Sequence, residues 1–151
     1  MKKITAVWAT LLLSLFIPVA SYALCVDVPL ANLRSGPGKK YKTVWQVYQY
    51  MPLEKISSSG NWYRVKDIDG YTEYVYKPLV TSRYRCAAVW SKTANIRTGP
   101  GIDYPEKFRE DAEKYDSFRV LKIKGSWVKV RSDYDQTGWI SRGLLWISEI
   151  R

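Results

Sequence analysis

The side chains that could do chemistry in this chain are few, and the residue type most often used in catalysis is missing. The 151 residues include no histidine, which removes Cys–His and Ser–His nucleophilic pairs and the usual catalytic zinc site. Two aspartate pairs, Asp67 with Asp69 and Asp133 with Asp135, could suggest the paired carboxylates of a glycosidase. Both pairs lie in segments typical of hairpin turns, where aspartate is favoured for turn geometry alone. We therefore expect no enzymatic activity and no catalytic residue.

The N-terminus has the pattern of an export signal. Lys2 and Lys3 precede an apolar run over residues 7–20, and the small residue Ala23 suits cleavage directly after it. The run is shorter than the roughly 20 apolar residues that a membrane span needs. We therefore expect a signal peptide over residues 1–23 and a secreted or periplasmic protein with no membrane span after cleavage. A retained N-terminal anchor is the alternative.

Two cysteines, Cys25 and Cys86, belong to the exported portion. Disulfides persist in exported proteins, and a bridge here would tie the start of the exported chain to its middle. We expect this intramolecular disulfide; free thiols or an intermolecular bridge are the alternatives. No metal or cofactor is expected, because histidine is missing and the Gly-Pro-Gly segments lack the lysine and the helix of a phosphate-binding loop.

Three motifs occur twice in the chain, in the same order. The first copy has ANLRSGPG at 31–38, GNWYRV at 60–65 and YTEYV at 71–75, and the second has ANIRTGPG at 94–101, GSWVKV at 125–130 and QTGWI at 136–140. A repeat of this kind indicates one structural unit used twice. We expect one domain over residues 24–82 and a second over residues 83–151.

The pattern inside each repeat is that of short strands joined by tight turns. Residues 120–124 and 127–131 flank a Gly-Ser pair, and Gly125 at the first central position suits a type II′ hairpin turn. In the strand that follows, valines alternate with Trp127 and two basic residues, so the two sets face opposite sides. Repeat one has a comparable alternation around Trp62. Many short strands of this type predict an all-β fold.

These motifs resemble those of the bacterial SH3 domain family. Its pattern is Asn, an apolar residue and Arg-Ser/Thr-Gly-Pro-Gly/Ser, followed by Gly-x-Trp-x-x-Val and a Gly-Trp-Val/Ile strand. The resemblance covers nearly all of the exported chain and implies two tandem small SH3-like β-barrels in the cell envelope, often with binding of cell-wall peptides or glycan. Repeat one departs from the pattern at Glu73 and Tyr74, where repeat two has the usual Gly138 and Trp139.

Aromatic residues are the candidate ligand-binding groups. They make up 15% of the chain, which is more than two small cores can easily bury, and aromatic rings are good platforms for peptides and sugars. The candidate site residues are Tyr41, Trp62, Tyr74, Tyr104, Trp127 and Trp139. For each tryptophan the alternative is a structural role, in its own barrel or against the other repeat.

Charge and aromatic content leave three classes of partner. The main hypothesis is a non-catalytic envelope protein that recognises a cell-wall peptide or glycan through aromatic-lined SH3-like surfaces. A protein–protein adaptor or inhibitor that uses the rigid tandem is the alternative. The formal charge of +10 also favours an anionic polymer as partner, although a merely basic soluble surface explains it equally well. The export signal argues against nucleic acid as that polymer.

Overall fold

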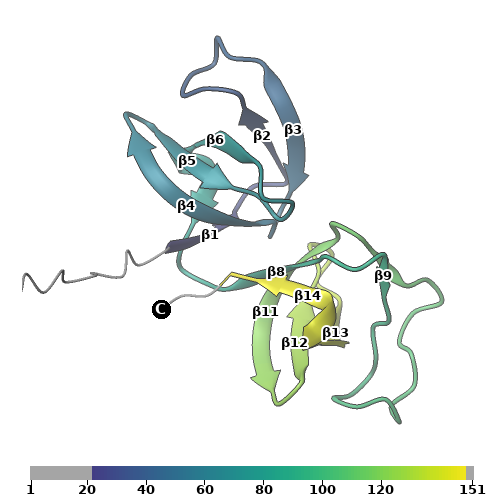
Figure 1. Ribbon diagram of the computed structural model, residues 1–151. Coiled ribbons are helices and arrows are strands. Elements are labelled where there is room, and N and C mark those ends of the chain that lie inside the picture. The colour runs from purple at the N-terminus through teal and green to yellow at the C-terminus, as the bar shows by residue number, and fades with distance from the viewer. Residues whose placement is uncertain (1–21, 149–151) are drawn as a thin grey trace, which may run out of the picture.

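The computed structural model describes residues 22–148, which form two sheet-based units in tandem (Figure 1). The signal peptide expected over residues 1–23 lies almost entirely outside the described residues, and its cleavage site stays a prediction. The first strand begins at Tyr22, before the expected cleavage site, and pairs there with Lys55. Within residues 22–148, no helix has the length and apolar character needed to cross a membrane.

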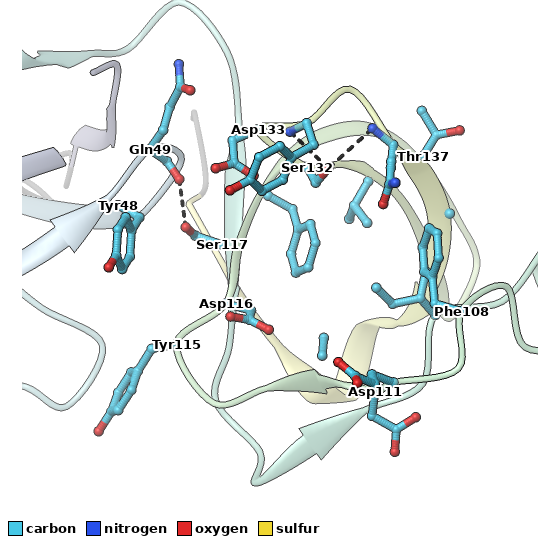
Figure 2. A pocket seen from close by; sticks show the side chains of 18 residues that line it. Tyr48, Gln49, Phe108, Asp111, Tyr115, Asp116, Ser117, Ser132, Asp133 and Thr137 are labelled. Carbon is cyan, nitrogen blue, oxygen red and sulfur yellow. Dashed lines mark hydrogen bonds between the residues drawn. The ribbon is translucent and has the colours of Figure 1, made fainter. Parts of the chain in front are cut away.

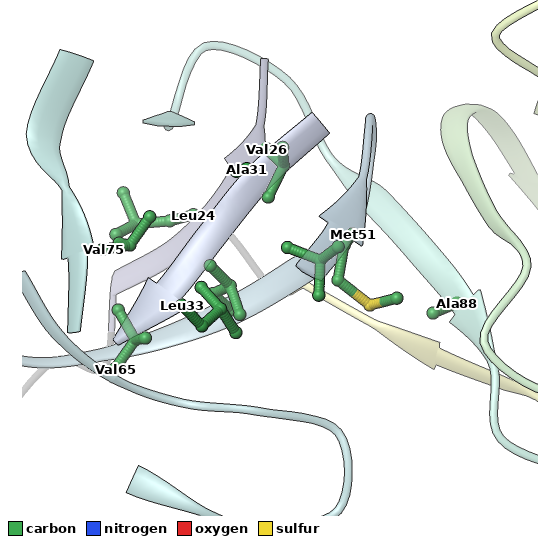
Figure 3. Close-up of a cluster of buried hydrophobic side chains, with 10 residues drawn as sticks. Leu24, Val26, Ala31, Leu33, Met51, Val65, Val75 and Ala88 are labelled. Carbon is green, nitrogen blue, oxygen red and sulfur yellow. The ribbon is translucent and has the colours of Figure 1, made fainter. Parts of the chain in front are cut away.

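Repeat one folds as a seven-stranded antiparallel sheet. In sheet order its strands are β3 (Thr43–Tyr48), β2 (Leu30–Arg34), β6 (Thr72–Tyr76), β5 (Trp62–Lys66), β4 (Pro52–Ser59), β1 (Tyr22–Val26) and β7 (Val80–Thr81). The 3₁₀ helix η1 (Lys77–Leu79) connects β6 to β7. Alternate side chains point inward along these strands, so Leu33, Val65 and Val75 are fully buried in one core (Figure 3).

Repeat two has a five-stranded sheet and a separate two-stranded one. The larger sheet has the order β13 (Thr137–Ser141), β12 (Trp127–Arg131), β11 (Ser117–Lys124), β8 (Cys86–Val89) and β14 (Leu145–Ile147), and the smaller pairs β10 (Ala112–Glu113) with β9 (Thr93–Ala94). The 3₁₀ helix η2 (Arg142–Leu144) precedes β14. The predicted hairpin turn is present, because Lys124 pairs with Trp127 and Gly125 has a φ of 57°.

Both units have the SH3-like fold, although neither sheet closes into a hydrogen-bonded barrel among the described residues. The first sheet ends at β3 and β7, and the second ends at β13 and β14. The register shifts between Lys55 and Ser57 in β4 and between Val120 and Lys122 in β11, which are matching places of the two repeats. Such irregularities bend a strand and increase its twist, so each long strand curls around its core.

Strand β8 contributes to both cores. Its four residues are all buried, and successive side chains of a strand point to opposite faces. Ala88 packs with the cluster of repeat one that contains Met51 (Figure 3), whereas Ala87 and Val89 belong to the core of repeat two. The two repeats are therefore joined through shared hydrophobic packing as well as through the chain.

The predicted disulfide is confirmed. Cys25 and Cys86 are bonded, with their Cα atoms 5.9 Å apart, and both are fully buried. The rings of Tyr50 and Tyr84 lie beside the bridge in an edge-to-face contact, with their centroids 5.8 Å apart. The Tyr84 hydroxyl donates to Oδ1 of Asp27 at 2.6 Å. Burial, and then the hydrogen bond to Asp27, raise the pKa of Tyr84.

A second set of contacts also joins the two repeats. Asp69 of repeat one accepts hydrogen bonds from the Tyr115 hydroxyl at 2.7 Å and from Nζ of Lys114 at 3.1 Å. The hydrogen bond from Tyr115 is the largest cause that lowers the pKa of Asp69. The Ser117 hydroxyl donates to the carbonyl oxygen of Gln49 at 2.7 Å. Together with the disulfide, these contacts hold the tandem as one unit.

Candidate functional site

The repeated Arg-Ser/Thr-Gly-Pro-Gly segment forms the same loop in both repeats. Nη1 of Arg34 donates to the carbonyl oxygen of Tyr41 at 2.8 Å, and Nη1 of Arg97 donates to the carbonyl oxygen of Tyr104 at 2.9 Å. The arginine thus closes the loop that starts directly after it. A hydrogen bond to a charged donor is stronger than a neutral one, which explains why the arginine accompanies the bend in each copy.

The candidate tyrosines of these loops pack on the glycines of the bend. A Cβ placed on Gly36 would overlap the ring of Tyr41, and one on Gly99 would overlap the ring of Tyr104. The glycines are therefore required by the close approach of the rings. Tyr41 is half-buried and Tyr104 is 47% exposed, so each ring covers its loop and stays partly accessible to solvent.

Tyr74 lies between two arginines on the outer face of repeat one. In the sheet it is directly opposite Arg34 of β2 on one side and Arg64 of β5 on the other. Residues directly opposite one another in antiparallel strands place their side chains on the same face. We call Arg34, Tyr74 and Arg64 row one.

Trp139 has the corresponding place in repeat two. It is opposite Lys129 of β12, and its backbone N–H donates to the carbonyl oxygen of Arg97 at 2.9 Å while Arg97 donates back at 2.8 Å. We call Arg97, Trp139 and Lys129 row two. Both rows place an aromatic ring between two cations, and Tyr74 and Trp139 are both half-buried. This repeated arrangement is a candidate surface for a ligand with carboxylate groups and flat or apolar faces.

The other two candidate tryptophans stand next to the rows. Trp62 is opposite Tyr76, and their rings are tilted with centroids 5.5 Å apart. Trp127 is opposite Ser141 instead, so repeat two has no second ring at that place. Both tryptophans are half-buried. The structure therefore places Trp62 and Trp127 beside Tyr74 and Trp139 in their own repeats; their role in binding stays a prediction.

Inside repeat one, Glu73 is a buried carboxylate. Its side chain is 7% exposed, and its Oε2 has no hydrogen-bond partner among the described residues. Burial, and then the negative charge of Asp67, raise the pKa of Glu73 to about 7. Asp67 itself accepts hydrogen bonds from the backbone N–H groups of Tyr71 and Asp69 at 2.8 and 2.9 Å. Repeat two has Gly138 at the position of Glu73.

Repeat two has a cavity of about 600 Å³ (Figure 2), within the usual range of ligand sites. Its lining combines an apolar interior, an acidic border and two residues of repeat one. The lining residues are Tyr48, Gln49, Ile96, Phe108, Glu110, Asp111, Ala112, Tyr115, Asp116, Ser117, Phe118, Val130, Ser132, Asp133, Tyr134, Gln136, Thr137 and Gly138. None of the six candidate aromatic residues lines it, so the cavity was not predicted from the sequence.

Two features of the sequence are related to the cavity. Residues 108–116 concentrate acidic and aromatic side chains, and Gly138 has no side chain at the position where repeat one has Glu73. Neither feature shows by itself that residues 108–116 fold beside Gly138. Within the described chain, no group of three His, Cys, Asp or Glu residues is arranged to hold a metal ion.

Among known proteins, a curated relative is the putative N-acetylmuramoyl-L-alanine amidase YrvJ of Bacillus subtilis (strain 168). It is 25% identical over 122 residues, which are 73% of this chain and 23% of that relative. The chain thus matches only a minor part of that relative's length.

Similar solved structures include NlpC1 from Trichomonas vaginalis, which is 11% identical with a TM-score of 0.37 over 83% of this chain and 45% of that one. An NlpC/P60 family protein from Bacillus cereus ATCC 10987 is 12% identical with a TM-score of 0.37 over 83% and 56% of the two chains.

Two family profiles, both described as Bacterial SH3 domain, match the chain one after the other. The first covers residues 27–81 and the second covers residues 92–145. These stretches contain both Gly-Pro-Gly loops and both rows. The chain therefore belongs to the bacterial SH3 domain family and carries two tandem copies of the domain.

Proposed function

We propose that this protein is an exported, non-catalytic binding protein of the cell envelope that recognises a cell-wall peptide or glycan. The observation that carries the proposal is the recurrence of a cation–aromatic–cation row at the same place in both repeats. The Cys25–Cys86 bridge supports the exported location, because disulfides persist in oxidising compartments.

The chemistry of the rows suits a ligand that alternates carboxylates with flat or apolar faces. Guanidinium and ammonium groups bind carboxylates through charge-assisted hydrogen bonds. The ring between them offers an apolar surface for a peptide plane or a sugar face. Peptides and glycans of the cell wall present both kinds of group, so one row would bind one short segment of such a polymer.

The comparisons support this proposal at the level of the family. Both halves match bacterial SH3 domains, and a relative whose name is that of a putative N-acetylmuramoyl-L-alanine amidase contains a similar region. A shared fold does not fix a shared function, so the proposal depends on the rows. The absence of histidine from the chain supports a non-catalytic role.

Retention on purified peptidoglycan tests the proposal. We expect the wild-type protein to sediment with the insoluble wall and to release no soluble fragments from it. A Tyr74→Ala/Trp139→Ala double variant should lose most of this retention. Tyr71→Ala is the matched control, because Tyr71 is 69% exposed in the turn before β6 and lies outside row one. No retention of the wild-type protein at low salt would refute the proposal.

An adaptor or inhibitor role is the second candidate, and the fixed junction between the repeats favours it. The disulfide and the hydrogen bonds from Tyr115 and Ser117 present both repeats as one continuous surface. Such a surface loses little conformational entropy when a protein partner binds. Specific co-purification with a single envelope protein at moderate salt, without retention on peptidoglycan, would favour this role instead.

A further inference from the structure

We propose that the cavity of repeat two binds a peptide through a free primary ammonium group. The cavity is separate from the two rows, and its chemistry is opposite to theirs. The proposal rests on the proposed function only for the source of the peptide, which would be the cell wall. The ammonium recognition itself follows from the shape, charge and aromatic lining of the cavity.

The interior of the cavity is apolar. Phe108 and Phe118 contribute rings, and Val130 and Ile96 contribute aliphatic side chains. Gly138 also lines the cavity, and Cγ2 of Ile96 packs against it in the space that a side chain would need. An interior of this kind accommodates the aliphatic stem of an amino-acid side chain, since burial of each methylene group stabilises the complex by about 0.8 kcal/mol.

Carboxylates stand around the interior. Asp111, Asp116 and Asp133 lie at different places around the cavity in Figure 2, and Glu110 also lines it. No lysine or arginine is among the lining residues, and none of the four carboxylates has an ion pair with another residue between 22 and 148. This local excess of negative charge stands out on a chain with a formal charge of +10. It complements a cation and disfavours the carboxylate end of a ligand.

Hydrogen bonds fix two of these carboxylates in place. Oδ1 of Asp111 accepts from Nδ2 of Asn95 at 2.8 Å, and Oδ2 of Asp116 accepts from the backbone N–H of Glu113 at 2.8 Å. Each carboxylate uses one oxygen in this way, and a carboxylate can accept several hydrogen bonds. The acidic border is therefore partly preorganised for a donor, which lowers the cost of binding.

Exposed tyrosines complete the border. Tyr134 is 83% exposed and Tyr48 is 67% exposed, and both line the cavity. Aromatic faces attract ammonium groups electrostatically, so these rings add to the attraction of the carboxylates. The combination of aromatic rings and carboxylates around an apolar interior distinguishes an ammonium group on an aliphatic stem from an uncharged side chain.

The tandem arrangement makes this a single site. Tyr48 and Gln49 belong to repeat one, and the hydrogen bond from Ser117 to the Gln49 carbonyl holds them beside repeat two. In repeat one, the position of Gly138 is taken by the buried side chain of Glu73. We therefore expect one peptide bound per chain.

Calorimetric titration of the full exported chain with two blocked tripeptides tests the proposal. The probes are acetyl-Ala-Lys-Ala-amide, which has one free ammonium group, and the same peptide with its lysine acetylated. We expect one-to-one binding of the first peptide, and binding weaker by about tenfold or more for the second, because hydrogen bonds to charged groups are the stronger ones. Equal binding of both peptides, or no binding of either, would overturn the proposal.

A near-isosteric double variant and a matched control variant locate the site. Glu110 and Asp133 are exposed and line the cavity, so Glu110→Gln/Asp133→Asn removes two charges with little risk to folding. We expect this double variant to bind the lysine peptide several-fold more weakly. Asp103→Asn is the matched control, because Asp103 is an exposed acidic residue outside the lining. An equal loss in the control would show a general charge effect and would refute the site.

Peptidoglycan with its free amino groups acetylated separates this proposal from the proposed function. If retention depends on the rows but is unchanged by acetylation, the ammonium proposal fails and wall binding stands. If the wild-type protein binds the lysine peptide at the cavity but is not retained on any peptidoglycan, wall binding fails and the ammonium proposal stands. The peptide then comes from another source. If both proposals hold, acetylation reduces the retention of the wild-type protein. It then causes no further reduction in the Glu110→Gln/Asp133→Asn variant.

Discussion

Cγ2 of Ile96 occupies the space that a Cβ on Gly138 would need. Ile96 directly precedes Arg97 and Gly138 directly precedes Trp139, and the backbones of Arg97 and Trp139 are hydrogen-bonded to each other. At the matching positions repeat one has Leu33, which is not branched at Cβ, and Glu73, which is buried. The two repeats thus differ in both residues of this pair, and the pair in repeat two leaves no room for a side chain at position 138.

The first prediction concerns this pair. Gly138→Ala should lower the free energy of unfolding by about 1–3 kcal/mol, because the added methyl group forces the Ile96 side chain or the backbone to move. Denaturant unfolding measures the change. Ile96→Leu, which copies repeat one, should restore part of the loss when combined with Gly138→Ala, as a double-mutant cycle would show.

Gly143→Ala is the control for the same measurement. A Cβ at Gly143 meets nothing within 4 Å, and Gly143 does not have a positive φ. We expect a change of no more than about 0.5 kcal/mol there, as is usual for surface positions. If Gly138→Ala were as harmless as Gly143→Ala, the close approach of Ile96 would not limit this position.

The second prediction is a pH dependence that originates in Glu73. Burial, and then the charge of Asp67, raise the pKa of Glu73 from 4.5 to about 7. The folded state therefore holds this proton over a pH range in which the unfolded state has lost it, and stability falls as pH rises from 4.5 to about 7. Burial also raises the pKa of Asp67, so this residue likewise makes stability fall as the pH rises above 3.8.

Glu73→Gln isolates that contribution. Glutamine keeps the shape of the protonated acid and does not titrate. Between pH 5 and pH 8, the free energy of unfolding of the variant should therefore fall by about 2–3 kcal/mol less than that of the wild type. Urea unfolding of both proteins at the two pH values gives the comparison. Because the chain has no histidine, that residue type cannot mask the difference. Parallel pH profiles for the two proteins would contradict the assignment to Glu73.

Much of the fold could be predicted from the sequence because its determinants are local. The alternation around Trp127 and the Gly125 turn fix a hairpin within a dozen residues, and the repeated Gly-Pro-Gly segment fixes the loop that each tyrosine covers. The pairing of Cys25 with Cys86 followed from there being two cysteines in an exported chain. None of these required knowledge of which strands are neighbours.

The rows and the cavity could not be predicted, because they depend on sheet neighbours and on the junction. That Trp62 and Arg64 share a face follows from alternation, but the pairing of Tyr74 with both Arg34 and Arg64 follows only from the order β2-β6-β5. The cavity needs residues 108–116, Gly138 and Tyr48 of the other repeat to meet in space.

The third prediction concerns the disulfide between the repeats. The bridge joins residues with a sequence separation of 61, and closing a loop of that size stabilises the folded state by about 4 kcal/mol in the chain-entropy model. A Cys25→Ser/Cys86→Ser variant should lose stability of that order, as denaturant unfolding would measure. Reduction of the wild-type protein with a thiol reagent under denaturing conditions, followed by refolding, should have the same effect. An unchanged unfolding midpoint for both would mean that the packing around β8 and Tyr84 suffices without the bridge.

The fourth prediction concerns the loop that Tyr104 covers. Gly99→Ala should destabilise the protein by about 1–3 kcal/mol, because the new methyl group overlaps the Tyr104 ring and must push it off the loop. Tyr104→Ala alone should destabilise the protein less than Gly99→Ala does, since Tyr104 is 47% exposed and buries only part of its ring. When the two substitutions are combined, the alanine at position 99 should lower the free energy of unfolding only a little further, because no ring remains for it to displace.

A loss of stability in the double variant equal to the sum of the two single losses would show that the ring does not determine the need for glycine. The charge-assisted hydrogen bond from Arg97 to the Tyr104 carbonyl survives in every variant, so this cycle measures the contact between ring and glycine apart from the closure of the loop.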